Sequence, residues 1–224
     1  ALAAAGPGCQ GQGLSRPTTR TMAAHPAPKR WRRLAIASLL YLGAVALGAG
    51  SAWWVLRHAS WSGSVVKVGP WTGSTLAGST DADMYTRAKG ALEGLLALGR
   101  DETMYYMARH DDAGRPLRSA CSYRVEGLPP PAHWWSVTAY ADDFFLFDAP
   151  NRQYSLNGST ARLDASGRFA LVTGHQAVDS LHWLPTPGQR GLVLTLRLYN
   201  PAPELQAAPA RLQPPSIKAI GACP

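Results

Sequence analysis

The sequence predicts a mainly β protein: an antiparallel β-sandwich or rolled sheet with one packing α-helix, preceded by one transmembrane helix. Three observations predict this class. An uncharged apolar run of 23 residues occupies positions 34–56. One stretch of helical periodicity follows it, and the remainder alternates apolar and polar residues in short segments separated by Asp, Gly and Pro. Short alternating segments joined by tight turns are typical of antiparallel sheets, which need a helix or a second sheet to cover one face.

Residues 1–33 form a basic leader ahead of the apolar run. The chain has a formal net charge of +8, and the leader supplies +6 of it because it holds six basic residues and no acidic one. The net charge of +2 that remains is too small to indicate phosphate binding, so we expect no nucleic-acid partner. Residues 1–21 are rich in Ala, Gly and Pro without apolar periodicity, which predicts disorder. Met22 directly precedes a conventional leader, and we expect translation to start there; if residues 1–21 are translated, they form a disordered cytoplasmic tail.

The apolar run Leu34–Leu56 predicts a transmembrane helix. At ~1.5 Å per residue it exceeds the ~30 Å hydrocarbon core of a bilayer. Basic residues cluster at 29–33 on its N-terminal side, whereas only Arg57 and His58 follow it directly. The positive-inside rule therefore places the N-terminus in the cytoplasm and the C-terminal domain in the periplasm. We expect a protein of the bacterial inner membrane that contacts lipid through this helix.

A cleavable signal peptide is the main alternative to this anchor. Signal peptides have a shorter apolar region followed by a small-x-small cleavage site, and Ala44–Ala46 and Gly50–Ala52 both fit that pattern loosely. The apolar run continues through Trp53–Leu56, however, which favours an uncleaved anchor. A buried core helix is a weaker alternative because of the length and the basic flank. Export follows from the anchor and from the signal peptide alike.

Three small residues, Ala44, Gly48 and Ala52, recur at every fourth position of the apolar run. This small-xxx-small spacing lets two membrane helices approach closely. The sequence therefore offers a homodimer through these residues, although small residues are common in membrane helices anyway.

Residues 57–80 carry Gly and Pro among Ser and Thr, which predicts a linker. A helix is expected next. Thr80–Asp83 has the form of a capping box, apolar residues repeat at helical spacing from Met84 to Leu96, and Gly99 supplies the stop. These signals predict one amphipathic helix of about four turns.

Beyond Gly99 the apolar period becomes two, which predicts strands. Three pairs of segments flank turn sequences rich in Asp, and we expect three hairpins. Their strands are Met104–His110 with Ala120–Glu126, Trp134–Tyr140 with Phe144–Phe147, and Arg162–Leu163 with Arg168–Thr173. The segment Gly191–Tyr199 places four leucines on one face and polar residues on the other, the pattern of a half-buried strand. Pro201–Ala208 is expected as a short helix.

Two of the three cysteines, Cys121 and Cys223, lie beyond the apolar run and therefore outside the cytoplasm, whereas Cys9 lies in the leader. An even pair in one exported domain is most simply a disulfide. Such a bridge would close about 100 residues and hold a tail that would otherwise fray. Two unpaired thiols, one of them reactive, are the alternative.

The sequence offers few signs of catalysis. The six histidines do not pair with one another, or with Cys or Glu, at the spacings that metal sites commonly use, so we expect no metal and no cofactor. His110 beside Asp111 and Asp112 is a ligand cluster on paper, but Asp-Asp-Ala-Gly is better explained as a turn. No nucleophile elbow, P-loop or dinucleotide fingerprint is present. Aromatic residues are dense in the predicted strands; core packing explains most of them, and a binding surface the rest.

An ordered set of motifs spans the outward part of the chain. The motifs are Asp83–Ala88, Tyr105, Trp134–Tyr140, Asn151–Ser155, His182–Pro185, Leu196–Tyr199 and Pro214–Ile217. In this order they resemble the DUF1214 family, a bacterial domain of unknown function, and in particular its small membrane-anchored members. The likeness covers about residues 70–223 and implies a largely antiparallel β domain, expected here over 81–224. The family usually has Asn where this chain has His182, and no activity carries over from it.

If the domain has a site, we expect it where the likeness is polar without an evident structural role. Those residues are Arg87, Ser136, Thr138, Tyr140, Arg152, His182, Trp183 and Arg197. Two functions remain. The first is a single-pass envelope protein whose periplasmic domain is a non-catalytic module for a wall, lipid or protein partner. The second is an exported hydrolase-like enzyme with a polar cleft around His182, Arg197 and Tyr140. Convergence of these side chains in one pocket would favour the enzyme, and their separation would favour the module.

Overall fold

The computed structural model describes residues 29–58, 65–76, 78–92, 98–99, 101–178, 181–221 and 223 of the chain. The chain divides into two compact units, Ala1–Ser51 and Ala52–Pro224, and each is described by itself. The expected translation start at Met22 and the predicted disordered tail lie outside the described residues.

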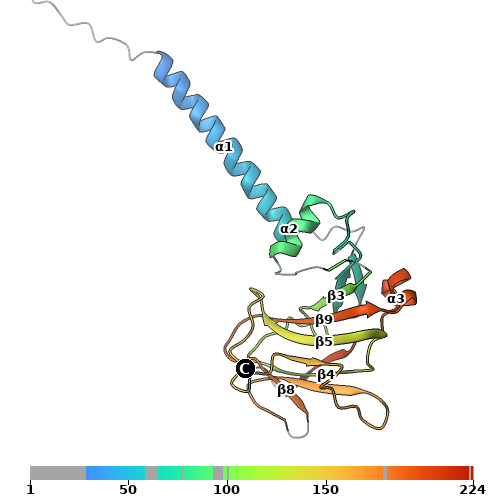
Figure 1. Cartoon of the computed structure of the whole chain (residues 1–224). Coiled ribbons are helices and arrows are strands. Elements are labelled where there is room, and N and C mark those ends of the chain that lie inside the picture. The colour runs from blue at the N-terminus through green and yellow to red at the C-terminus, as the bar shows by residue number, and fades with distance from the viewer. Residues whose placement is uncertain are drawn as a thin grey trace, which may run out of the picture. The chain divides into compact units, whose positions relative to one another are not determined.

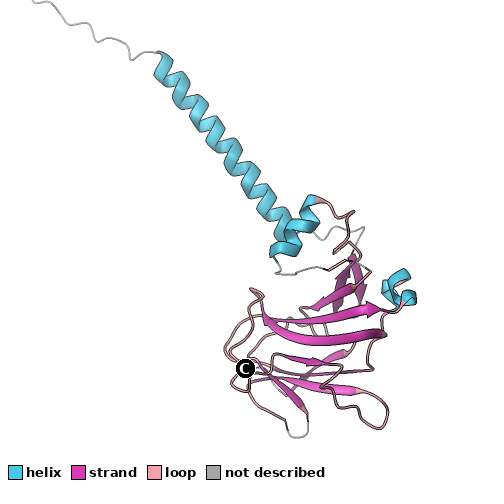
Figure 2. Ribbon diagram, in the orientation of Figure 1, coloured by secondary structure: helices cyan, strands magenta, loops and turns pink. Residues whose placement is uncertain are grey.

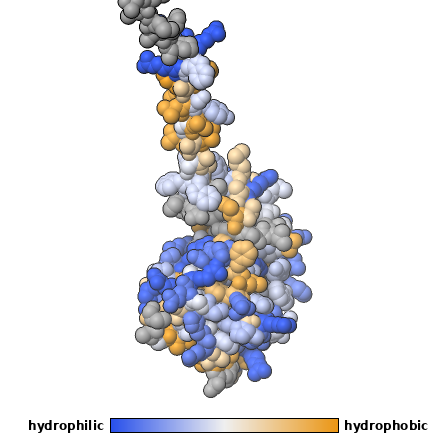
Figure 3. Space-filling view, turned by 90° about the vertical axis from the view of Figure 1, so that its left-hand side faces the viewer, coloured by the Kyte–Doolittle hydropathy of each residue, from blue (hydrophilic) through white to orange (hydrophobic). Residues whose placement is uncertain are grey.

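The helix α1 (Lys29–His58) occupies the predicted apolar run. Within its segment Lys29–Val55, an 18-residue window reaches a mean hydropathy of 1.8, so the helix is long and apolar enough to cross a bilayer. Figure 3 shows apolar side chains along much of the helix and hydrophilic ones near its N-terminal end. Ala44 and Gly48 are exposed on it. The helix itself is confirmed, whereas membrane insertion and pairing with a second copy stay predictions.

The second unit contains two β-sheets in two layers, as Figure 1 and Figure 2 show. Among the described residues, the six-stranded sheet has the order β1-β2-β3-β9-β5-β6 with antiparallel neighbours throughout. The four-stranded sheet has the order β10-β4-β7-β8, in which β7 and β8 are parallel. The strands are Val65–Val68 (β1), Trp71–Ser74 (β2), Thr103–Ala108 (β3), Ser122–Gly127 (β4), Ala132–Ala141 (β5), Ser155–Asn157 (β6), Phe169–Gly174 (β7), His182–Pro185 (β8), Leu192–Pro201 (β9) and Ser216–Ile220 (β10). The predicted mainly β class is confirmed, with one parallel pair.

The hydrophobic core lies between the inner faces of the two sheets. On β9, Leu194, Leu196 and Leu198 have no exposed surface and belong to this core, which confirms the predicted leucine face. The prediction of a half-buried strand is wrong for the first part of β9, because Val193 and Thr195 on its other face are buried as well. The reason is position: β9 is a central strand, so side chains on both β3 and β5 shield its smaller outer residues.

The turns of the three predicted hairpins form, but the segments on either side of each turn do not pair with each other as strands. After the Asp111–Gly114 turn the chain changes sheet, because β3 pairs with β2 and β9 whereas β4 pairs with β10 and β7. Asp and Gly fix a turn within a few residues, but burial across the whole domain decides which strands pair. At each of the three turns, the flanking segments share a single isolated β-bridge: His110 with Pro116, Tyr140 with Leu146, and Leu163 with Phe169.

The expected linker 57–80 contains two strands, so that prediction is wrong over residues 65–74. β1 and β2 pair through a turn in which Gly69 has a φ of 59°, a left-handed conformation that favours glycine. The Gly69-Pro70 pair that predicts a loop is therefore the turn of a hairpin. Trp71 on β2 is fully buried and donates its indole N–H to the Pro215 carbonyl at 2.8 Å.

The helix predicted after the linker is confirmed over its described part, α2 (Met84–Leu92). Its cap is Asp83 instead of the expected Thr80. The Asp83 Oδ1 accepts hydrogen bonds from the backbone N–H groups of Tyr85 at 2.8 Å and Thr86 at 2.9 Å. Two of the N–H groups that a helix start leaves unpaired are thus satisfied. The last predicted turn of this helix, 93–97, lies outside the described residues.

A different helix packs on the core. Met84 on α2 is 78% exposed, and no described residue of α2 belongs to the core. The short helix α3 (Pro203–Ala207) forms within the predicted Pro201–Ala208 and contributes Leu205, and Leu212 follows after a 3-10 turn. Within the described ranges, α3 is therefore the packing helix.

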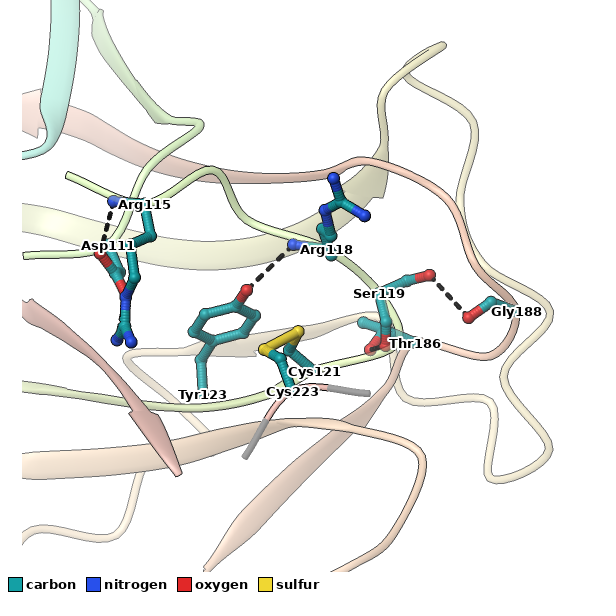
Figure 4. Close-up of a disulfide and its surroundings, with 9 residues drawn as sticks. All are labelled: Asp111, Arg115, Arg118, Ser119, Cys121, Tyr123, Thr186, Gly188 and Cys223. Carbon is teal, nitrogen blue, oxygen red and sulfur yellow. Dashed lines mark hydrogen bonds and ion pairs between the residues drawn. A yellow bond between two sulfur atoms is a disulfide. The ribbon is translucent and has the colours of Figure 1, made fainter. Parts of the chain in front are cut away.

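Cys121 and Cys223 form a disulfide with a Cα–Cα distance of 4.9 Å (Figure 4), which confirms the predicted pairing. Cys121 directly precedes β4, and Cys223 follows β10, the neighbour of β4. Asp112 holds the same strand: its N–H donates to the Ile217 carbonyl at 2.9 Å, and its Oδ2 accepts from the Ile217 N–H at 3.0 Å. The C-terminal strand is therefore fastened both covalently and by hydrogen bonds.

Candidate functional site

The outer face of the six-stranded sheet carries a polar surface that we call the Arg197 face. Side chains alternate across a strand, so the residues next to the core leucines of β9 point outward. Neighbouring strands add their own outward residues at the paired positions. Its polar and aromatic members are Thr103, Tyr105, Trp134, Ser136, Thr138, Tyr140, Thr195, Arg197 and Tyr199, and the apolar Met107 and Val193 lie on the same side. Trp134, Tyr140, Arg197 and Tyr199 are partly exposed, whereas the other polar and aromatic members are buried.

Strand register sets the order of these side chains. Arg197 lies between Tyr105 on β3 and Ser136 on β5. One step along β9, Thr195 lies opposite Thr138. At the other end, Tyr199 lies opposite Thr103 and Trp134. Along β9, the polar and aromatic members are therefore the hydroxyl groups of Thr195 and Thr138, then the Arg197 guanidinium, then the rings of Tyr199 and Trp134.

The Arg197 guanidinium is held by neutral groups. Its Nη1 donates to Thr138 Oγ1 at 3.2 Å and its Nη2 donates to the Tyr140 hydroxyl at 3.0 Å. Its central carbon lies 5.3 Å from the centre of the Tyr140 ring, within cation–π range. The adjacent strands β3, β9, β5 and β6 contain no Asp or Glu, and Arg197 is their only Lys or Arg. Across the described part of the chain, no carboxylate pairs with Arg197.

The remaining members of the face are aromatic or buried. The rings of Trp134 and Tyr199 meet edge to face, with centroids 5.1 Å apart at 65°, and both residues are partly exposed. Thr103 and Thr195 are 1% exposed, and their hydroxyl groups have no hydrogen-bond partner among the described residues. Buried hydroxyl groups normally have a hydrogen-bond partner, so these two hydroxyl groups are exceptions.

His182 lies on a different surface. It pairs with the core residue Leu171 across β7 and β8, so its side chain points to the inner side of the four-stranded sheet. Burial lowers the pKa of His182 below the usual 6.5, although a hydrogen bond with the Ser155 backbone acts in the opposite direction. Its Nε2 is buried without a partner. The six-stranded sheet therefore separates this imidazole from Arg197.

The other predicted residues are also apart from the face. Trp183 donates its indole N–H to the Gly174 carbonyl at 3.0 Å. Arg87 donates to the carbonyl groups of Ala82 and Thr80, at 2.8 and 2.9 Å, just ahead of α2. Arg152 is exposed in a loop with a φ of 54°. Of the eight predicted residues, the structure brings together Ser136, Thr138, Tyr140 and Arg197.

The Asp111–Gly114 segment has the turn role predicted for it. Asp111 Oδ1 accepts from the N–H groups of Ala113 and Arg115 at 3.0 and 2.9 Å, and its Oδ2 accepts from the Arg115 guanidinium. Figure 4 shows this pair close to the disulfide region. Burial alone would raise the pKa of Asp111, but the hydrogen bonds and charge of Arg115 lower it overall. Over the residues that the structure describes, no three His, Cys, Asp or Glu residues gather as a metal site.

Sequence reasoning missed five members of the Arg197 face. Tyr105, Trp134, Thr195 and Tyr199 carry a signal, since each alternates with a core residue along its strand. Thr103 has no such signal because it opens its strand. Pairing across β3, β9 and β5 joins segments far apart in the sequence, so alternation alone does not show that these side chains share one surface.

The model of a protein family described as "Protein of unknown function (DUF1214)" matches residues 102–203, in agreement with the resemblance. A comparison with curated proteins finds no match. The crystal structure of the VPA0106 protein from Vibrio parahaemolyticus is similar, with a TM-score of 0.54 and 18% identity over 89% of this chain. This chain spans only 47% of that protein. A crystal structure of an uncharacterized protein from Burkholderia cenocepacia has a TM-score of 0.40 and 18% identity, over 53% of this chain and 29% of that one. The first likeness supports the fold alone.

Proposed function

We propose that this chain, whose residues 102–203 match the DUF1214 family model, is a single-pass envelope protein whose β domain is a non-catalytic binding module. In this proposal α1 anchors the chain in the bacterial inner membrane and the β domain lies in the periplasm. The module binds an envelope ligand through the Arg197 face.

The anchor rests on length, composition and charge. α1 is apolar over a span that matches a bilayer, and four of its first five residues are Lys or Arg. This asymmetry favours a cytoplasmic N-terminus. The Cys121–Cys223 disulfide supports the periplasmic location of the domain, because disulfides persist in oxidising compartments and are rare in the cytosol.

The single observation that carries the binding role is the state of Arg197. Its guanidinium is partly exposed, is oriented by Thr138 and Tyr140, and has no carboxylate partner among the described residues. An arginine that only stabilises a sheet is usually neutralised or projects freely into solvent. A cation that is fixed in place but not neutralised is suited to recognition.

The hydrolase-like alternative needs His182, Arg197 and Tyr140 to converge. His182 points toward the core from β8, whereas Arg197 and Tyr140 lie on the outer face of the other sheet. A general base must be within hydrogen-bond reach of the group it activates, directly or through one water. This separation supports the binding module over the enzyme.

Topology is tested on the full chain with alkaline phosphatase fused after Pro224, because this reporter folds only outside the cytoplasm. We expect active phosphatase that stays with the membranes on carbonate extraction. The control replaces Lys29, Arg30, Arg32 and Arg33 with Glu, which should lower the activity by weakening the orientation signal. An inactive fusion would contradict export, and a mature N-terminus near Ala46 or Ala52 would contradict the uncleaved anchor.

The binding surface is tested in living cells by placing the photoreactive residue benzoylphenylalanine at Tyr199, where it replaces one aromatic ring of the face by another. The matched control carries it at Phe145, which is 71% exposed outside the face. Irradiation should produce a crosslinked species of fixed size from position 199 only. Equal products from both positions, or none from position 199, would contradict a binding module on this face.

A further inference from the structure

The unused donors of Arg197 define the charge of its ligand. A guanidinium group has five N–H donors, of which one on each terminal nitrogen is used by Thr138 and Tyr140. Among the described residues, the other three donors, including the Nε–H, have no partner. This planar fork matches the two oxygen atoms of a carboxylate. A neighbouring anion would also offset the cost of holding a partly buried charge without a partner.

The groups around Arg197 define the rest of the ligand. Hydroxyl groups surround the guanidinium on β5 and β9, and two of them, on Thr138 and Tyr140, already contact it. Beneath the face, the buried Thr195 hydroxyl has no partner among the described residues. Ser136, Thr138 and Thr195 are 4%, 7% and 1% exposed, whereas Tyr140 and Tyr199 are partly exposed. A tyrosine hydroxyl both donates and accepts, so these two residues suit a ligand that carries hydroxyl groups of its own.

The aromatic end of the face supplies a flat apolar surface one strand step from the cation. Trp134 and Tyr199 pack edge to face and remain partly exposed. Such rings present a large apolar area together with a polar edge, which suits the C–H face of a sugar ring. The strands around Arg197 form no long apolar groove, because Ser136 and Thr138 occupy the outward positions of β5 between the aromatic residues.

We infer that the Arg197 face binds a carboxylate-bearing saccharide, and this inference rests on the proposed binding function. The carboxylate lies on the free edge of the Arg197 guanidinium. The sugar ring lies against Trp134 and Tyr199, and its hydroxyl groups exchange hydrogen bonds with the partly exposed Tyr140 and Tyr199.

The test is calorimetric titration of the full chain in detergent with trigalacturonate, a trisaccharide with a carboxylate on each ring. Maltotriose supplies rings without carboxylates, acetate supplies a carboxylate without a ring, and inorganic phosphate supplies a different anion. We expect trigalacturonate to bind at least tenfold more tightly than each of the other three. Equal or weaker binding of trigalacturonate than of maltotriose, acetate or phosphate would overturn the inference.

Substitutions test whether trigalacturonate binds at the Arg197 face. Arg197→Gln should weaken trigalacturonate at least tenfold, and Arg197→Lys less, because Lys keeps the charge but not the fork. Tyr140→Phe, which removes only the hydroxyl that orients Arg197, should weaken it about threefold. Arg211→Gln, an exposed arginine outside the face, is the matched control and should bind like wild type. Thermal melting of each variant separates loss of binding from loss of folding.

The two proposals fail in different ways. If position 199 forms crosslinks in cells but trigalacturonate does not bind, the ligand class is wrong and the binding module stands. If position 199 forms no crosslinks and no trigalacturonate binds, both are wrong. Binding of trigalacturonate that Arg197→Gln leaves unchanged would overturn the assignment to this face.

Discussion

The two sheets of the domain are stabilised in different ways. The six-stranded sheet depends on its long central strands, with β5 paired to β9 from Ala132 to Ala141, and on the packing of its inner face. The four-stranded sheet has a short edge strand, β10, which the Cys121–Cys223 disulfide and Asp112 hold in place. The candidate site lies on the first sheet.

The difference follows from position in the fold. A five-residue edge strand has a neighbour on one side only and opens easily, so the covalent link and the side-chain contacts stabilise β10. β9 has neighbours on both sides and needs neither. Its outer face carries Thr195, Arg197 and Tyr199, none of which belongs to the hydrophobic core. The covalent fastening therefore lies in the four-stranded sheet, and the face proposed for binding lies on the six-stranded sheet.

Breaking the disulfide should have the largest effect. In the chain-entropy model a bridge spanning 102 residues contributes about 4–5 kcal/mol, so reductant should lower the free energy of unfolding of wild type by up to that amount. Urea unfolding followed by tryptophan fluorescence measures it. The matched control is Cys223→Ser, which should already be destabilised and should not respond further to reductant. A wild type that is insensitive to reductant would contradict a fastening role.

Removing core packing tests the six-stranded sheet. Leu196 has no exposed surface at the centre of β9, so Leu196→Ala should cost about 3 kcal/mol of unfolding free energy in urea, within the usual 2–5 kcal/mol range. The control is its sequence neighbour on the opposite face: Arg197→Gln should cost roughly 1 kcal/mol, the net value of an ordinary hydrogen bond. Equal losses of unfolding free energy in the two variants would contradict the difference between the inner and outer faces of β9.

Two turns of the same sequence pattern, Asp-x-x-Gly-Arg, sharpen the comparison. Asp111 and Asp164 both accept from the N–H groups two and four residues on, but only Asp111 is buried. Asp111→Ala should cost about 1–3 kcal/mol in urea unfolding, because it leaves partly buried N–H groups unpaired. Asp164→Ala should cost less, since water can replace the exposed carboxylate.

Acid should abolish this contribution of Asp111. Its folded pKa is lowered from the usual 3.8, so the charged carboxylate stabilises the fold above pH 3.8 and the benefit disappears as the pH falls through the folded pKa. The difference between wild type and Asp111→Ala should therefore shrink below pH 3.8. A difference that is constant with pH would show that the charge of Asp111 is irrelevant.

The smallest effect concerns the contact between the sheets at β6 and β8. The folded pKa of His182 is below 6.5 because of burial, so the unfolded chain binds more protons just below that pH and the free energy of unfolding falls on acidification. His182→Asn, which cannot be protonated, should flatten the profile between pH 7 and pH 5. His175→Asn, at an exposed position, is the control and should keep the wild-type slope. An unchanged slope in His182→Asn would contradict the lowered pKa of His182.

The sequence alone determined the local features of this protein. The apolar helix, the alternating strands, the Asp-x-x-Gly turns and the cysteine pair each depend on neighbouring residues or on simple counting. Composition misled at Gly69-Pro70, which forms a hairpin turn instead of a linker.

Tertiary structure decided the rest. The changes of sheet after Asp111–Gly114, the parallel β8 and the register across β3, β9 and β5 depend on burial over the whole domain. Arg197 contacts Thr138 and Tyr140 from 59 and 57 residues away, whereas His182, only 15 residues before Arg197 in sequence, faces the core. Periodicity shows on which side of its own strand a residue lies, and long-range pairing decides which residues share that side.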